Sequence, residues 1–409
     1  MNREQKKNLL KRALDTGSGV VRLAPAWVPR SFLMPGGRLK LARQNLYALG
    51  AERGGIDERW LASTTRADNG PGTPADEGLS YIVIEDGSRI EKVLLKEAID
   101  LMGDLLLGSA VMKKYGGWTV LTKLFDNLGP IPFHMHQTDE SAKKVGRTGK
   151  AESYYFPPQL NFVENSFPYT FFGLNPSTTK QDIIRCLARW NDGDNGILDY
   201  SRAYRIQPGT AWDVPAGILH APGSLVTYEL QQASDVFAMF QSMLEGRYVS
   251  WDLVIKDVPP EFHQDLDYIA GMIDWDKNVD PEFVRHRYME PLPVSRLETM
   301  KSQGYIENWV SYKSQHFSGK ELTVFPRQSV TTHDDAAYGL LVMQGRGTVG
   351  SMEVETPTLI RFGELTSDEL FVTAAAARGL RVVNTSSREN LVILKHFGPG
   401  NPSVPSPAQ

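Results

Sequence analysis

The feature that most constrains this chain is a pair of histidines in an apolar run, followed by a carboxylate and a third histidine. His134 and His136 alternate along Ile131-Pro-Phe-His-Met-His136, and a strand there would turn both imidazoles to the same side. Glu152 opens a strand-like run after a glycine-bearing turn, and His220 ends a Pro-Ala-Gly turn. Three imidazoles and one carboxylate form a ligand set for a divalent first-row metal. The sequence therefore predicts a metal centre held by β-strands.

Composition narrows the classes of partner and compartment. The chain has 409 residues and a net charge of −4, so we expect two or three domains and no nucleic-acid partner. No apolar run approaches the ~20 residues that a membrane span needs, and the N-terminus lacks the apolar segment of a secretory signal. Cys186 is the single cysteine, which excludes an intramolecular disulfide. We expect a cytoplasmic protein without membrane contact.

Periodicity predicts a mostly β chain with a few helices. Helical spacing covers 4–15, 94–107 and 177–192, and the last of these has a Ser/Thr start and a Gly-rich stop. Short apolar runs broken by Gly and Pro fill 115–240 and predict a barrel or sandwich. The strand rhythm returns from about 305 and predicts a second barrel, with strands expected at 321–325, 338–343, 347–350, 358–362, 370–373, 380–383 and 391–394.

Several motifs, in order, resemble those of the type I phosphomannose isomerases, a branch of the cupin superfamily. The similarity extends over roughly 30–240. The motifs that carry it are Ile56-Asp-Glu-Arg-Trp-Leu-Ala-Ser63, Leu121-Thr-Lys-Leu-Phe-Asp126, Gly149-Lys-Ala-Glu152, Val214-Pro-Ala-Gly-Ile-Leu-His-Ala221 and Tyr228-Glu-Leu-Gln-Gln-Ala-Ser-Asp235.

The resemblance implies two cupin (jelly-roll) β-barrels with helices packed at the N-terminus and between strands. We expect a metal-binding catalytic domain over 1–245, with a helical insert near 177–192, and a connector over 246–300. A second barrel without metal should cover 301–398, and a disordered tail should cover 399–409. The protein should be a monomer or a homodimer.

The resemblance also implies a site and a reaction. His134, His136, Glu152 and His220 would bind a divalent metal, zinc first, with manganese, iron or cobalt as alternatives. Enzymes of the family interconvert an aldose and a ketose by proton transfer between C1 and C2 through a cis-enediol. Glu229 matches the proposed base and Lys150 a lysine near the metal. Substrate contacts would come from Lys123 and Trp60.

Two departures put the phosphosugar specificity of the family in doubt. The family's catalytic arginine falls on Met239, and a serine implicated in phosphate binding falls on Pro132. A thioether can neither stabilise an enediolate nor pair with a phosphate. Arg202 and Arg247 are candidates to restore the missing cation. His134 replaces a glutamine of the family and keeps the site able to bind metal.

Four functions stay open on the sequence. The first is an aldose–ketose isomerase of the mannose-6-phosphate isomerase type, and the second is an isomerase of an unphosphorylated sugar. The third is an iron- or manganese-dependent cupin oxygenase, since three histidines and a glutamate also suit those metals. The fourth is a non-catalytic sugar-binding cupin. In all four the partner is a small molecule, a sugar or sugar phosphate in the first two.

Overall fold

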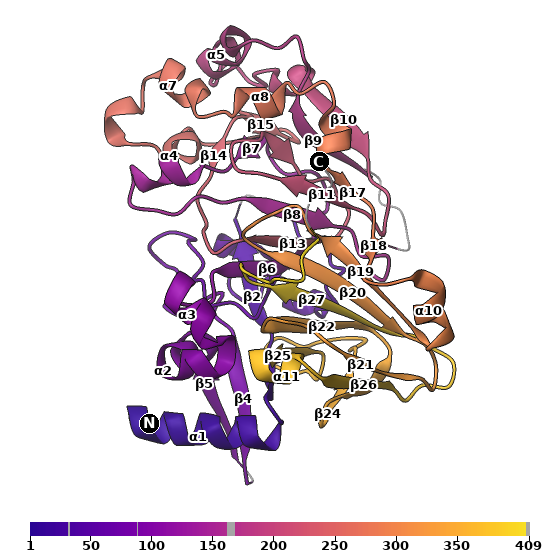
Figure 1. The fold of residues 1–409 in the computed structure, drawn as a ribbon. Coiled ribbons are helices and arrows are strands. Elements are labelled where there is room, and N and C mark those ends of the chain that lie inside the picture. Colours follow the sequence, from indigo (N-terminus) through magenta and orange to yellow (C-terminus); the bar gives the residue numbers. More distant parts are fainter. Residues whose placement is uncertain (32, 88, 162–167, 406–409) are drawn as a thin grey trace.

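The computed structural model describes residues 1–31, 33–87, 89–161 and 168–405, and it shows a mostly β molecule built from stacked antiparallel sheets (Figure 1). A five-stranded sheet, a seven-stranded sheet, a nine-stranded sheet and a four-stranded sheet follow one another from one end of the molecule to the other. Within the described residues no sheet closes on itself, so the two expected barrels are pairs of facing sheets in a cupin-like fold.

The first pair of sheets is built mainly from the N-terminal half of the chain. The five-stranded sheet has the order β10 (Ser201–Arg205), β9 (Tyr169–Leu174), β12 (His220–Ala221), β7 (His134–Met135), β14 (Ala238–Met239). The seven-stranded sheet has the order β17 (Tyr288–Met289), β11 (Ala211–Val214), β8 (Glu152–Tyr155), β13 (Thr227–Gln232), β6 (Val120–Phe125), β3 (Gly55–Leu61), β2 (Ala26–Arg30). Aromatic side chains such as Tyr154, Phe172 and Trp212 pack between them.

The second pair of sheets is built mainly from the C-terminal half. The nine-stranded sheet has the order β18 (Leu292–Pro293), β19 (Tyr305–Ser311), β20 (Ser318–Val324), β27 (Leu391–Phe397), β22 (Tyr338–Gln344), β25 (Glu369–Val372), β1 (Val20–Ala24), β4 (Tyr81–Asp86), β5 (Arg89–Leu94). The four-stranded sheet has the order β21 (Ser329–Thr332), β26 (Leu380–Asn384), β23 (Arg346–Val349), β24 (Met352–Glu355). β15 (Met243–Leu244) and β16 (Arg247–Tyr248) form a separate hairpin.

Helices lie at both ends of the stack and in the connector. They are α1 (Arg3–Thr16), α2 (Leu95–Leu107), α3 (Ser109–Tyr115), α4 (Asp139–Lys143), α5 (Lys180–Ala188), α6 (Asp252–Ile255), α7 (Leu266–Gly271), α8 (Trp275–Asn278), α9 (Phe283–Arg287), α10 (Leu297–Ser302) and α11 (Ala374–Ala377). Capping boxes at Asn2 and Thr179 explain why α1 and α5 begin where they do. No helix in the described part of the chain is long and apolar enough to cross a bilayer.

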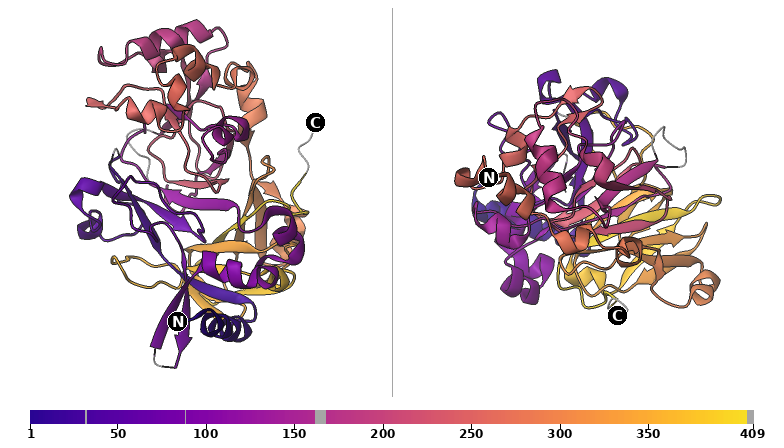
Figure 2. Two further views of the ribbon diagram at one scale, coloured as in Figure 1. Left: turned by 90° about the vertical axis from the view of Figure 1, so that its left-hand side faces the viewer. Right: turned by 90° about the horizontal axis from the view of Figure 1, so that it is seen from above.

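Three N-terminal strands complete the C-terminal sheet. Val20 in β1 pairs with Val372 in β25, and β1 also pairs with β4, which pairs with β5. Figure 2 shows α1 beside these strands, at the far end of the molecule from the five-stranded sheet. The domain boundaries expected at 245 and 301 stay predictions, because the nine-stranded sheet mixes strands from the N-terminal and C-terminal halves of the chain.

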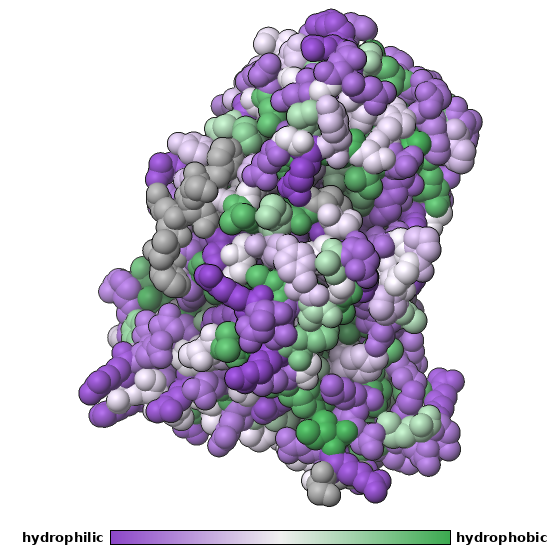
Figure 3. Space-filling view, turned by 180° about the vertical axis from the view of Figure 1, so that it is seen from behind, coloured by the Kyte–Doolittle hydropathy of each residue, from purple (hydrophilic) through white to green (hydrophobic). Residues whose placement is uncertain are grey.

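The expected C-terminal elements were largely found, with one correction. Residues 358–362 do not form the predicted strand, because their one ladder contact is an isolated bridge between Ile360 and Leu41. In the tail, Val404 packs against the C-terminal core and Ser403 donates a hydrogen bond to Asp335, while 406–409 lie outside the described residues. The face in Figure 3 is mostly hydrophilic with scattered hydrophobic residues.

A buried group of four charges lies inside the second pair of sheets. On β27 the side chains alternate, so that Lys395 points away from the seven-stranded sheet and its neighbour His396 bonds Tyr228 of that sheet. The Nζ atom of Lys395 lies 2.7 Å from Glu307 Oε1 and 2.8 Å from Asp334 Oδ2. Lys320 Nζ lies 2.6 Å from Asp334 Oδ1. Two ammonium groups and two carboxylates therefore balance in the core.

Candidate metal centre

The structure brings the three predicted histidines together in the five-stranded sheet. His220 on β12 pairs directly with His134 on β7, and His136 follows β7 on the same side. The ring centroid of His134 lies 4.2 Å from that of His220 and 5.0 Å from that of His136. One ligand nitrogen of each ring lies within 4.8 Å of the others, so this group could hold a metal ion.

The turn before His220 requires a glycine. Gly217 has φ of +84°, and a Cβ there would meet the backbone and side chain of Asp274. Its N–H donates to the carbonyl of His136 over 2.8 Å. The Pro-Ala-Gly turn therefore fixes the start of β12 against the strand that carries the other two histidines.

Each imidazole is oriented by a backbone carbonyl. Nδ1 of His134 lies 2.8 Å from the oxygen of Pro132, Nδ1 of His136 lies 2.7 Å from that of Val236, and Nδ1 of His220 lies 2.8 Å from that of Ile218. A carbonyl can only accept, so each Nδ1 carries its proton and each Nε2 keeps a lone pair. The three Nε2 atoms are thereby prepared to act as ligands.

Glu152 reaches the histidines from the facing seven-stranded sheet. Its Oε1 lies 2.9 Å from Nε2 of His136, and its Oε2 lies 3.3 Å from Nε2 of His220. The hydroxyl of Tyr154, two residues further along β8 on the same face, donates to Oε2 over 2.6 Å. The period of two along the strand therefore brings a carboxylate and the group that orients it to one place.

The donor set fits a divalent cation. All four side chains are at most 5% exposed, and Nε2 of His220 makes no hydrogen bond to any described residue. Burial lowers the pKa of His136 to about 4, and burial and the neighbouring imidazoles lower the pKa of His134 well below its usual value. Burial acts to raise the pKa of Glu152, yet His136 and Lys150 outweigh it and hold that pKa well below its usual range. Neutral imidazoles beside an ionised carboxylate are the forms that bind metal.

Lys150 lies next to the ligand atoms. Its Nζ is 2.8 Å from Oε1 of Glu152 and 3.2 Å from Nε2 of His136. The side chain is 4% exposed, so its ammonium group is held inside the cavity. Lys150 therefore lies beside the candidate ligand atoms, and its role near a metal stays a prediction from sequence.

Glu229 and Lys123 form a cross-strand pair beside the centre. They are directly opposite in the β13–β6 ladder, and Lys123 Nζ lies 3.3 Å from Glu229 Oε1. Burial, and then the negative charge of Glu152, raise the pKa of Glu229 well above its usual value, against the opposing effect of Lys123. Both side chains line the cavity of about 50 Å³ that adjoins His134 and His136.

Trp60 lies near this cavity without lining it. The indole is fully buried in an apolar cluster with Val28 and Leu121, and its N–H donates to Oε2 of Glu58 over 2.6 Å. Trp60 therefore supports two residues of the cavity wall, Glu58 through this hydrogen bond and Arg30, whose guanidinium carbon lies 5.9 Å from the centroid of the indole ring. A substrate contact by Trp60 stays a prediction from sequence.

The structure adds Arg30, Glu58 and Asp235, which sequence reasoning did not identify as site residues. Arg30 contacts Glu58 at 3.2 Å and Asp235 at 3.3 Å, and Glu58 contacts Lys123 at 3.4 Å. Glu58 and Asp235 belong to the family-like motifs, which is a signal that could have identified them. Arg30 precedes the first motif and carries no such signal.

The two arginines suggested as replacement cations lie elsewhere. Arg202 donates to the carbonyls of Asp280 and Asn278, and Arg247 is an exposed partner of Glu245. Met239 lines the cavity from β14, where it pairs with His134. Arg30 is thus the arginine that lines the cavity in the described part of the chain.

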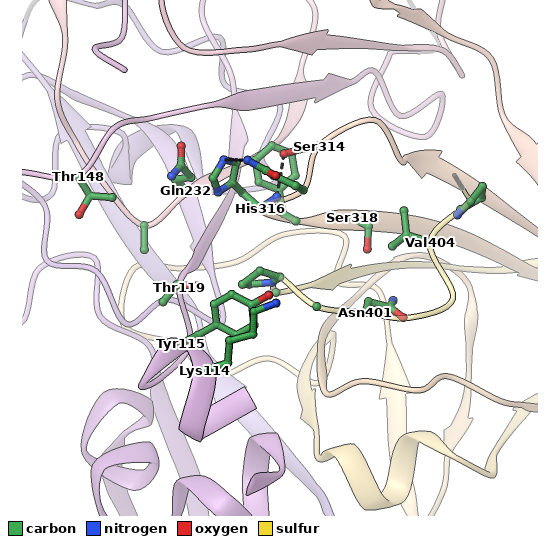
Figure 4. Close-up of a pocket in the computed structure, with 17 residues that line it drawn as sticks. Lys114, Tyr115, Thr119, Thr148, Gln232, Ser314, His316, Ser318, Asn401 and Val404 are labelled. Atoms are coloured by element: carbon green, nitrogen blue, oxygen red, sulfur yellow. Dashed lines mark hydrogen bonds between the residues drawn. The ribbon is translucent and has the colours of Figure 1, made fainter. Parts of the chain in front are cut away.

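A larger cavity lies apart from the candidate metal centre. It measures about 700 Å³, and hydroxyl and amide side chains such as Thr148, Gln232, Ser318 and Asn401 line it together with apolar groups (Figure 4). The carbonyl oxygen of the Gln232 side chain accepts from the N–H of Ala151, so this cavity lies behind the segment that carries Lys150. The chemistry of the histidines is confined to the smaller cavity.

Comparison with known proteins identifies the fold. Neither a family model nor a curated protein sequence matches this chain. Among solved structures, mannose 6-phosphate isomerase from Bacillus subtilis is 15% identical with a TM-score of 0.59, covering 93% of this chain and 99% of its own. A point mutant of phosphomannose isomerase from Salmonella typhimurium is 13% identical with a TM-score of 0.60, covering 93% and 100%. A zinc-bound mannose 6-phosphate isomerase has the same identity, TM-score and coverage. The chain therefore has the fold of the type I phosphomannose isomerases.

Proposed function

We propose that this protein is a metal-dependent aldose–ketose isomerase of the mannose-6-phosphate isomerase type. The observation that carries the proposal is the convergence of three oriented imidazoles and Glu152 on one point, next to a buried carboxyl group and a buried lysine. The shared fold supports the proposal, because two of the similar solved structures are named as mannose 6-phosphate isomerases.

A divalent metal, zinc first among the candidates, would be held by His134, His136, His220 and Glu152 and would polarise the oxygens on C1 and C2 of the sugar. Tyr154 orients Glu152 by its hydrogen bond. Lys150 places a positive charge beside the same ligand atoms, where it can donate to a substrate oxygen. These residues prepare the site before any proton moves.

Glu229 is the group that we assign to proton transfer. The reaction moves a proton from C2 to C1 and a hydroxyl proton between the adjacent oxygens, so it needs neither oxidant nor reductant. A carboxyl group whose pKa is raised above its usual value is a stronger base than an ordinary carboxylate, which suits it to take a proton from carbon and return it. Lys123, its cross-strand partner, holds that carboxylate toward the cavity.

The test combines metal analysis with solvent exchange. The purified protein is assayed for bound metal, and sugars are followed by proton NMR in deuterium oxide for exchange at C2. The proposal requires about one equivalent of divalent metal per chain and enzyme-dependent exchange. His136→Ala should abolish both, and the exposed His286→Ala serves as the matched control that should change neither. Full exchange in a metal-free His136→Ala protein contradicts the mechanism.

The all-histidine nitrogen set also favours a second candidate, an iron- or manganese-dependent oxygenase. Such an enzyme would consume oxygen and would be inactive with zinc. Anaerobic exchange at C2 by the zinc-loaded protein separates the isomerase from this candidate. Metal binding without exchange or oxygen uptake would instead indicate a sugar-binding module.

A further inference from the structure

The cationic side chains that line the metal-site cavity all have carboxylate partners. Arg30 is paired with Glu58 and Asp235, and Lys123 lies between Glu58 and Glu229. Lys150 lies 2.8 Å from Glu152. Each partner distance is at most 3.4 Å, so among the described lining residues no cation is available to a new anion without losing a partner.

The charges of the cavity are balanced without any further anion. Three cations face four carboxyl groups along its wall, so these protein groups carry no net positive charge whether Glu229 is ionised or protonated, and a net positive charge would come from a divalent metal at the histidines. A phosphate monoester carries about −1.5 to −2 charges at neutral pH. It would have to lose water beside the carboxylates of Glu58, Glu152 and Asp235, and like charges in a buried site repel strongly.

The rest of the described wall of the cavity is largely hydrophobic. It is formed by the side chains of Leu33, Phe125, Ile131, Pro222, Phe237 and Met239, together with Tyr154, whose hydroxyl already donates to Glu152. Such a wall matches the carbon face of a sugar, while the carboxylates and ammonium groups match its hydroxyls.

The nearest outer cations are also paired. Lys256 Nζ lies 4.4 Å from the ring centroid of Phe237, which places it just outside the cavity wall. Lys256 and Arg147 each lie 3.4 Å from the same oxygen of Asp68. Burial raises the pKa of the nearby Asp257, and the positive charge of Lys256 partly opposes that rise. If the substrate carried a phosphate, Lys256 and Arg147 are the two residues that would bind it.

We propose that the substrate is an uncharged, unphosphorylated aldose or ketose, an inference that rests on the proposed isomerase function. The balanced inner charges and the hydrophobic wall fit a neutral polyol. Among the described residues that line the cavity, each cation already has a carboxylate partner, so none is uncommitted and able to receive the phosphate of a phosphorylated sugar.

The experiment compares free and phosphorylated sugars on the metal-loaded protein. Exchange at C2 is measured for mannose and fructose and, under the same conditions, for their 6-phosphates, with free and phosphorylated pentoses alongside. We expect kcat/KM to be at least tenfold higher for a free sugar. The KM of that sugar should also change by less than twofold between about 20 and 500 mM salt, because screening does not affect a neutral ligand.

Two outcomes overturn the inference in distinguishable ways. Exchange that is faster with the 6-phosphates refutes the substrate class and leaves the isomerase proposal intact. Exchange with no sugar at all refutes the isomerase proposal, and the substrate class falls with it.

A rim variant gives an independent check. Replacing both outer cations, Arg147→Ala with Lys256→Ala, should leave kcat/KM for the free sugar within twofold of the unmodified protein. A tenfold loss that is confined to a phosphorylated sugar would identify these two residues as a phosphate subsite and overturn the inference.

Discussion

Removing one ammonium group from the buried charges of the second pair of sheets should destabilise the protein strongly. Lys395 is fully buried and contacts Glu307 and Asp334 at 2.7 and 2.8 Å. In Lys395→Met, Lys320 alone faces both carboxylates, and breaking a buried ion pair by removing one partner costs about 3–5 kcal/mol. With the entropy of unfolding of a chain of this size, that is a loss of about 3–6 °C in Tm.

The assay is urea unfolding at pH 7, followed by the fluorescence of the eight tryptophans. Lys96→Met is the matched control, because Lys96 and Asp100 form an exposed pair at 3.1 Å whose loss should cost less than about 0.5 kcal/mol. Lys395→Met combined with Glu307→Gln should recover more than half of the loss, since it removes one charge of each sign and keeps the contact of Lys320 with Asp334.

The pH dependence of this loss has a definite sign. Burial acts to raise the pKa of Asp334, but Lys395 and Lys320 outweigh it and lower that pKa, so this group stabilises the fold above its unfolded pKa of about 3.9. The contribution disappears as the pH falls through the lower folded pKa. The difference between Lys395→Met and the unmodified protein should therefore shrink below about pH 4. A cost under 1 kcal/mol at pH 7, or no recovery in the double variant, would refute the reasoning.

Four further predictions concern the candidate metal centre. His136→Ala and His220→Ala should each lose both bound metal and activity, as measured by metal analysis and C2 exchange; an active, metal-free variant would contradict the site. Glu229→Gln should lower kcat at least a hundredfold while metal content stays unchanged, and an unaltered kcat would remove Glu229 as the proton carrier. Lys150→Met should bind metal at least tenfold more tightly, because a positive charge 3.2 Å from Nε2 of His136 is removed, and should lose activity; weaker metal binding in a competition titration would count against this placement. Metal-free protein should lose stability as the pH falls from about 6.5 to about 4. In this range histidines of the unfolded chain bind protons, whereas the buried His136 stays neutral. A free energy of unfolding that does not change across that window would contradict the lowered pKa.

Much of the fold could be predicted because its signals are local. The helices at 4–15 and 94–107 appear as α1 and α2 within one residue, and most expected C-terminal strands are present. The failed strand at 358–362 has the right alternation but follows Pro357 and precedes Gly363. Its backbone meets one partner, Leu41, so no ladder could form and Leu359 is left exposed.

The site was predictable to the extent that its residues belong to ordered motifs. His134, His136, Glu152 and His220 were proposed together from sequence, and the structure places them in one cluster, although their role as ligands stays a proposal. Arg30 was not predictable, because its partners Glu58 and Asp235 lie 28 and 205 residues away. Pairings at such distances leave no periodic trace in the chain. For the same reason the pairing of β1 with β25 could not be predicted from the sequence.

The pairing of β1 with β25 has a consequence for the synthesis and folding of the protein. β1 leaves the ribosome early and can pair with β4 soon afterwards, yet its other edge has no partner until residues 369–372 have been synthesised. At about 5–20 residues per second, Val20 waits on the order of 20–70 s for Val372. During that interval a hydrophobic strand edge is open to pairing with a neighbouring nascent chain. We expect the yield of native protein to depend on chaperones and on growth temperature more strongly than the stability of the finished molecule would suggest.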